Sequence, residues 1–165
     1  MVRALVFMGA VAGCAVDRVP PPTRPCATDQ LDLEVAPPDG DFGDLVGDPD
    51  LWCGHPPQGG APFSPLRVRV TGPDVFADGV DLDMSVVDNQ TGEELGHTAL
   101  ALGLTCANVG DSAGTWVGSE AHLRYTGFAL DTLGERSGTL TLTVAPRTAD
   151  TPVVTRSFDV ALVVD

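Results

Sequence analysis

Apolar and polar residues alternate along most of this chain of 165 residues. The clearest run is 139–144, where Leu140, Leu142 and Val144 alternate with threonines. A period of two is that of a strand with one buried face, and no segment keeps the i, i+3, i+4, i+7 spacing of an amphipathic helix. The pattern therefore predicts an all-β fold. The alternating runs cover residues 30–35, 66–70, 80–86, 95–106, 115–125, 139–144 and 158–164.

The turn-forming residues between these runs indicate how the strands are arranged. About seven short strands separated by Gly, Pro, Asn and Asp are typical of a single antiparallel β-sandwich, here over residues 29–165. The number of runs and the closing strand at 158–164 resemble immunoglobulin-like and fibronectin type III-like domains. The Cys-Trp-Cys spacing of true immunoglobulin domains is missing, so the resemblance concerns architecture alone. A jelly roll and a transthyretin-like sandwich are the alternative arrangements, and such folds host many functions.

The first fourteen residues have the parts of an export signal. Arg3 precedes an apolar run that is too short to cross a bilayer of about 30 Å. The segment Val11-Ala12-Gly13-Cys14 resembles the lipobox of bacterial lipoproteins. This resemblance implies that residues 1–13 are a cleaved signal peptide and that Cys14 carries the lipid anchor. The alternative is a secretory leader cleaved elsewhere, with Cys14 an ordinary residue.

Residues 14–28 are rich in proline, which fixes φ and removes backbone donors, so we expect an extended tether. The chain has a formal net charge of -14 and contains no lysine. Nucleic acid and anionic lipid are therefore not expected as partners. The missing lysine also excludes Schiff-base chemistry on lysine and a phosphate-binding loop of the Walker type.

Three cysteines remain once Cys14 is assigned to lipid, and outside the cytoplasm they indicate one disulfide and one odd thiol. Cys106 ends an alternating run, and Cys53 follows Trp52 in a segment of turn formers. We expect the pair Cys53–Cys106, with Cys26–Cys53 as the alternative. A zinc site is not expected because no two of these cysteines form a Cys-x-x-Cys pair.

The segment 36–65 shows no periodicity and is predicted to be a long loop. Loops of this length are unusual inside a compact domain, so it is either a functional loop or a disordered insertion. Because tryptophan is favoured at binding hot spots, we expect Trp52 to contact a partner. The alternative is that Trp52 belongs to the core.

The same segment holds the densest group of carboxylates. Calcium prefers several oxygen ligands, so a calcium site is possible at Asp39, Asp41 and Asp44. The spacing differs from that of an EF-hand, because Gly43 stands where an acid is needed and Asp44 where glycine is needed. No metal is expected if the loop is simply solvated. The acidic binding candidates are Asp39, Asp41, Asp44, Asp48 and Asp50.

A short motif raises the question of catalysis. Gly110-Asp-Ser-Ala-Gly114 resembles the segment around the nucleophile of trypsin-like proteases, which would make Ser112 a nucleophile. Neither His55 nor His97 lies in a segment that resembles the protease histidine segment, and no two of the three histidines share metal-ligand spacing. A turn between two strands is the expected role of 110–114.

Taken together, these patterns predict a cell-envelope lipoprotein, anchored in the outer membrane and facing either the periplasm or the surface. Its acidic sandwich would be a non-catalytic binding or structural module, with no cofactor. The expected partners are the membrane, through the lipid, and an envelope protein or glycan. The alternatives are a calcium-dependent carbohydrate- or protein-binding domain and a serine hydrolase using Ser112.

Overall fold

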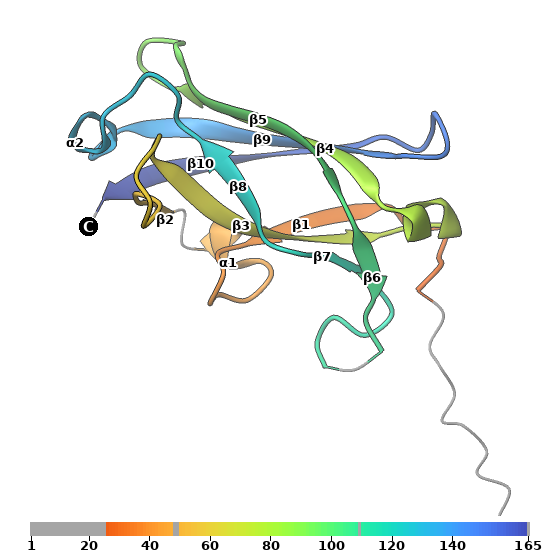
Figure 1. Ribbon diagram of the computed structural model, residues 1–165. Helices are drawn as coiled ribbons and strands as arrows, with labels where there is room; N and C mark the ends of the chain where they lie inside the picture. The colour runs from red at the N-terminus through yellow and green to blue at the C-terminus, as the bar shows by residue number, and fades with distance from the viewer. Residues whose placement is uncertain (1–25, 48–49, 109, 165) are drawn as a thin grey trace, which may run out of the picture.

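Two β-sheets pack face to face in the computed structural model, which describes residues 26–47, 50–108 and 110–164 (Figure 1). The predicted signal peptide, Cys14 and most of the predicted tether lie outside these ranges. The first sheet contains β1 (Asp32–Ala36), β3 (Phe63–Thr71), β6 (Leu104–Cys106), β7 (Trp116–Gly118) and β8 (Ala121–Arg124). The second contains β2 (Asp50–Cys53), β4 (Val80–Asp88), β5 (Glu94–Leu102), β9 (Ser137–Pro146) and β10 (Val154–Val164).

The strand order is β1-β3-β7-β6 in the first sheet, where β8 also pairs with β3, and β2-β10-β9-β4-β5 in the second. Neighbouring strands are antiparallel except β2 and β10, which run parallel. The predicted all-β, antiparallel sandwich is confirmed.

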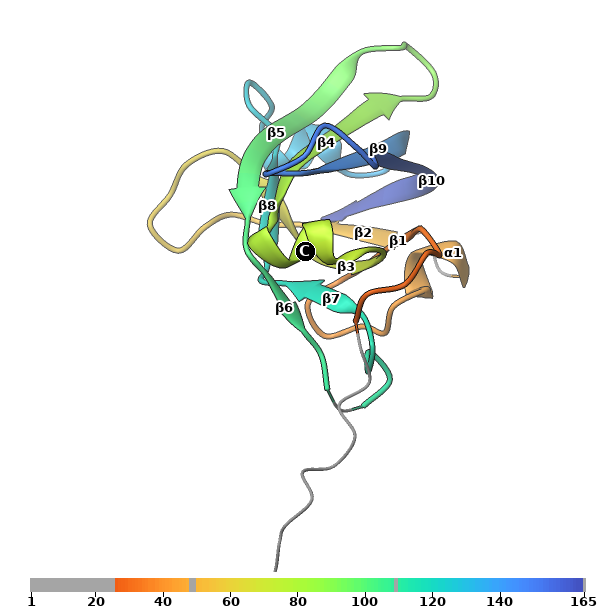
Figure 2. The same cartoon turned by 90° about the vertical axis from the view of Figure 1, so that its right-hand side faces the viewer.

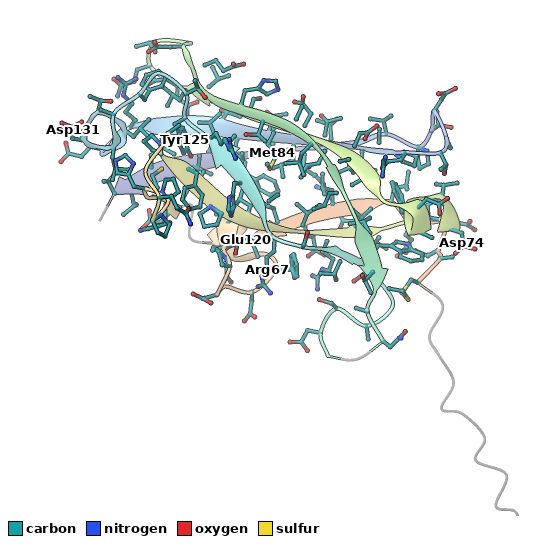
Figure 3. The ribbon with its side chains drawn as sticks, in the orientation of Figure 1. Arg67, Asp74, Met84, Glu120, Tyr125 and Asp131 are labelled. Atoms are coloured by element: carbon teal, nitrogen blue, oxygen red, sulfur yellow. A yellow bond between two sulfur atoms is a disulfide. The ribbon has the colours of Figure 1, made fainter. Side chains whose placement is uncertain are left out.

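The core follows directly from the alternation, because every second residue of a strand points into the space between the sheets. Leu66, Val68 and Val70 of β3 are fully buried, and β4 and β9 contribute similar rows from the opposite sheet. Burial of such apolar surface is the main stabilising contribution to a fold of this size. Figure 3 shows Met84 and Tyr125 within the body of the sandwich, and Asp74 and Asp131 at its two ends.

Residues 89–92 form the hairpin turn that joins β4 to β5. Gly92 has φ +72°, in the left-handed region that favours glycine. Asp88 accepts the backbone N–H groups of Gln90 (2.7 Å) and Thr91 (2.9 Å) on its carboxylate. These hydrogen bonds hold the pKa of Asp88 below its ordinary value. The glycine and the Asp88 carboxylate therefore stabilise this turn.

Two alternating runs each divide between strands. The run 95–106 is interrupted at Gly103, so β5 lies in one sheet and β6 in the other. The run 115–125 divides into β7 and β8, both of which pair with β3. Within the described ranges, three short helical segments were not predicted: α1 (Asp44–Gly47), the 3-10 helix η1 (Asp74–Asp78) and α2 (Leu130–Leu133).

The prediction of a structureless loop over 36–65 is wrong. It contains α1 and β2, and β3 already begins at Phe63. Strand β2 has only four residues, but its alternate residues Leu51 and Cys53 are buried. It is stabilised by parallel pairing with the end of β10, which places Trp52 beside Val163. A local sequence window cannot reveal a partner so distant along the chain.

The predicted disulfide pair Cys53–Cys106 is also wrong. The disulfide joins Cys26 to Cys106, with 5.8 Å between their Cα atoms, and Cys53 is a free, buried thiol. The reason is the change of sheet at Gly103, which carries Cys106 away from β2 and toward the start of the domain. Because Cys26 is buried and Ala27 bridges to Gly72, residues 26–28 pack with the domain, which was predicted to begin at 29.

Candidate functional site: a surface formed by three strands

Three rings meet where the chain crosses from the second sheet to the first. Trp52 of β2 and Phe63 of β3 form an edge-on contact, with centroids 6.3 Å apart and planes at 89°. The His122 ring of β8 lies 4.5 Å from that of Phe63. We call Trp52, Phe63 and His122 the ring cluster.

Backbone pairing explains why the rings converge. Gly54 and Phe63 exchange backbone hydrogen bonds of 3.0 and 2.9 Å, which bring β2 beside β3. The Trp52 indole lies so close to Gly54 that a Cβ there would come within 2.0 Å of the ring. On the other side, β8 pairs with β3 so that Arg124 is opposite Phe63 and His122 is opposite Pro65. Side chains that lie directly or diagonally opposite on one face of paired strands are neighbours, so His122 and Arg124 lie beside Phe63.

Two depressions adjoin the ring cluster, and we call them together the Arg124 groove. One, of about 470 Å³, lies between β5 and β8 and is lined by residues 97–100, 120–122 and 124. The other, of about 240 Å³, lies between residues 56–61 and the side chains of Phe63, His122 and Arg124. Figure 2 shows the segment that joins β2 to β3 projecting from the side of the sandwich, near β8. His122 and Arg124 line both depressions.

The charged groups of the groove differ in their partners. His122 is 2.7 Å from the Glu120 carboxylate, and His97 is 3.0 Å from that of Asp83. The hydrogen bond to Asp83 raises the pKa of His97 above its ordinary value of 6.5. The backbone N–H of Arg124 donates to the Thr98 hydroxyl (3.0 Å) and fixes its strand against β5.

A buried polar network lies under this surface. The Ser64 hydroxyl is 2.8 Å from the Tyr125 hydroxyl and 3.4 Å from the Cys53 sulfur, and all three residues are fully buried. Cys53, Ser64 and Tyr125 directly follow Trp52, Phe63 and Arg124 in the sequence. Successive residues of an extended chain point to opposite faces, so these three side chains lie beneath the surface. Burial raises the pKa of the Cys53 thiol and that of the Tyr125 hydroxyl, so both stay protonated and available as donors. The network links the three segments that carry the ring cluster and Arg124.

The acidic candidates lie elsewhere. Asp44 accepts the backbone N–H of Asp41 (2.6 Å), and Asp39 stays within the same loop. Arg69 holds this loop through Phe42, whose ring centroid lies 4.4 Å from the guanidinium carbon. Asp50 is exposed at the start of β2, and Asp48 lies outside the described residues.

The described part of the chain contains no group of three or more His, Cys, Asp or Glu placed to hold a metal ion.

Ser112 lies in the turn between β6 and β7. Its hydroxyl is 3.3 Å from a nitrogen of Arg69, which donates to it. Within the described ranges no histidine hydrogen-bonds to Ser112, and His97 and His122 are instead paired with carboxylates. Among the described residues, no histidine is placed to act as a general base for this serine.

No protein-family model and no curated protein matches this chain. None of the helical segments within the described ranges has the length and apolarity of a bilayer-spanning helix. The immunoglobulin-like resemblance stays a prediction.

Sequence reasoning singled out Trp52 but missed Phe63, His122 and Arg124. Strand β3 does extend back to Phe63 in phase with 66–70, but the sequence does not show it, because polar Ser64 takes a buried position and apolar Phe63 an outer one. His122 and Arg124 lie on one face of a four-residue strand, and only its pairing with β3 brings them beside Phe63.

Proposed function

We propose that this protein is a cell-envelope lipoprotein, anchored through Cys14, whose sandwich is a non-catalytic binding module. The ring cluster and the Arg124 groove form its contact surface. Aromatic residues are enriched at binding hot spots, and Trp52 keeps 40% of its surface exposed. The partner is a glycan or protein of the envelope.

One observation carries this proposal: the surface and the start of the domain lie at opposite ends of β3. Phe63 begins this strand and Thr71 ends it, beside the bridge between Ala27 and Gly72. Nine strand residues span about 27 Å. Figure 1 shows the first described residues near η1, and β2 at the other end of the sandwich. A lipid attached before residue 26 would thus leave the surface directed away from the membrane.

The binding proposal is tested with the mature full-length protein, extracted in detergent and sedimented with purified cell-wall sacculi of the producing bacterium. Trp52→Ala should weaken binding roughly 30-fold, as expected for a hot spot worth about 2 kcal/mol. The control is Val153→Ala, which removes an exposed apolar side chain from the loop between β9 and β10. EDTA in a parallel sample tests calcium dependence.

Binding that is unchanged by Trp52→Ala would contradict the assignment of the surface, and no binding by the unaltered protein would contradict a cell-wall glycan as the partner.

Mass spectrometry of the same preparation tests the anchor. The expected result is a diacylglyceryl group on Cys14 as the first residue, and an unmodified Cys14 would contradict the anchor. Cys14→Ser should leave the leader uncleaved.

A further inference from the structure

Arg124 differs from the other described arginines in having no partner for its guanidinium. The chain has 23 acidic residues against 9 basic ones, so an arginine readily finds a carboxylate. Arg69, Arg136, Arg147 and Arg156 each pair with one, and Arg67 donates to the carbonyls of Pro37 and Gly40. In the described part of the chain only Arg124 forms no ion pair or side-chain hydrogen bond, and it lines both depressions of the groove.

The charge around Arg124 suits a ligand with a single negative charge. Glu120 is the only acidic residue that lines either depression, and it is already paired with His122. The groove is therefore close to neutral on a molecule with a net charge of -14. A single carboxylate can bind Arg124 through two parallel hydrogen bonds, whereas the field of the whole protein repels a polyanion.

The rings indicate what carries that carboxylate. Phe63 lies directly opposite Arg124 in the register, and the His122 ring is its diagonal neighbour. The face of an aromatic ring is negative, so it attracts the C–H groups on the face of a sugar ring. Thr98 still has its hydroxyl proton to donate, because it accepts from the backbone of Arg124. The larger depression, at about 470 Å³, is within the usual range for a small ligand. Phe63 lines the smaller depression, so a ligand that contacts both Thr98 and Phe63 extends across the two.

We infer that the Arg124 groove binds a sugar unit that carries one carboxylate, with Arg124 on the carboxylate and Phe63 and His122 against the sugar ring. This inference rests on the proposed binding function and names the class of its ligand. An acidic peptide would pair with Arg124 but would gain less than a flat sugar ring from the Phe63 and His122 rings.

The test compares two disaccharides that differ by one group. Cellobiouronic acid carries one carboxylate, and cellobiose is its neutral counterpart. Affinities for the full-length protein in detergent are measured by calorimetry. We expect the acidic sugar to bind roughly tenfold more tightly, as one charge-assisted contact predicts. Arg124→Gln should remove this preference, and Phe63→Ala should weaken both sugars.

Arg147→Gln is the matched control, because Arg147 is exposed at the far end of β9 and lies 3.8 Å from Asp81. Equal binding of the two sugars, or a preference that survives Arg124→Gln, would overturn the inference while leaving the binding function intact. If neither sugar binds but an acidic peptide does so through Arg124, the sugar class is wrong. If Phe63→Ala and Trp52→Ala also leave sacculus binding unchanged, the proposed function fails with it.

Discussion

Removal of the Cys26–Cys106 disulfide is the change whose cost follows most directly from the fold. The variant is Cys26→Ser with Cys106→Ser. The two cysteines are 80 residues apart, so the bond closes a ring that includes more than half of the domain. In the chain-entropy description, closing a ring of this size in the unfolded state is worth about 4.5 kcal/mol at 25 °C.

Fraying in the folded state makes the expected loss of stability smaller than about 4.5 kcal/mol. Cys26 lies only a few residues before β1, and its neighbours are held by the Ala27–Gly72 bridge and the hydrogen bond from the Thr28 amide to the Gly72 carbonyl (3.0 Å). Without the disulfide this short segment can fray, which returns some entropy to the folded chain. We therefore expect a loss of about 2 to 4.5 kcal/mol. For a domain of about 140 residues the upper value lowers the melting temperature by about 15 °C.

Urea unfolding at equilibrium measures this loss. The unaltered protein is compared with the double variant and with the unaltered protein under a thiol reductant, and the last two should agree. The slope of free energy against urea should rise in both, because the unfolded chain without the ring is more expanded. A loss below about 1 kcal/mol would refute the reasoning, because the bond would then constrain little of the unfolded chain.

Two further predictions concern thiol chemistry and pH. Because Cys53 is fully buried and its thiol pKa is raised, a thiol reagent should label it only after unfolding; labelling of Cys53 in the native protein would contradict its position in β2. Since the pKa of His97 is raised by Asp83, its stabilising contribution is complete below pH 6.5 and is lost as the pH rises through the raised pKa. Asp83→Asn should therefore lower stability at about pH 5.5 but not at about pH 9, and NMR titration of the His97 ring should show the pKa falling toward its ordinary value. An unchanged His97 pKa in that variant would contradict the ion pair.

Sequence periodicity predicted those strands whose partners are close in the chain or whose runs are long. The runs at 80–86 and 139–144 became the centre of the second sheet, because their alternate residues face the core along most of their length. Such strands need no information about their neighbours to be recognised.

The candidate site depended on information that the local sequence does not hold. Trp52 belongs to a strand that exists only because β10 lies beside it, and Arg124 meets Phe63 only through the register of β3 and β8. The disulfide was predicted wrongly because one residue, Gly103, moves the chain from one sheet to the other. Long-range pairing therefore decides the site, and local pattern decides the scaffold.

The position of the Cys26–Cys106 bond also determines how the domain would carry a mechanical load. A pull on the chain before Cys26 would otherwise act on the Ala27–Gly72 bridge and then on β1, an edge strand of five residues. The covalent bond divides the force between the two edge strands of the first sheet, β1 and β6. Tension on the tether thus enters this sheet at both edges before it reaches the far end of the sandwich, where the ring cluster lies.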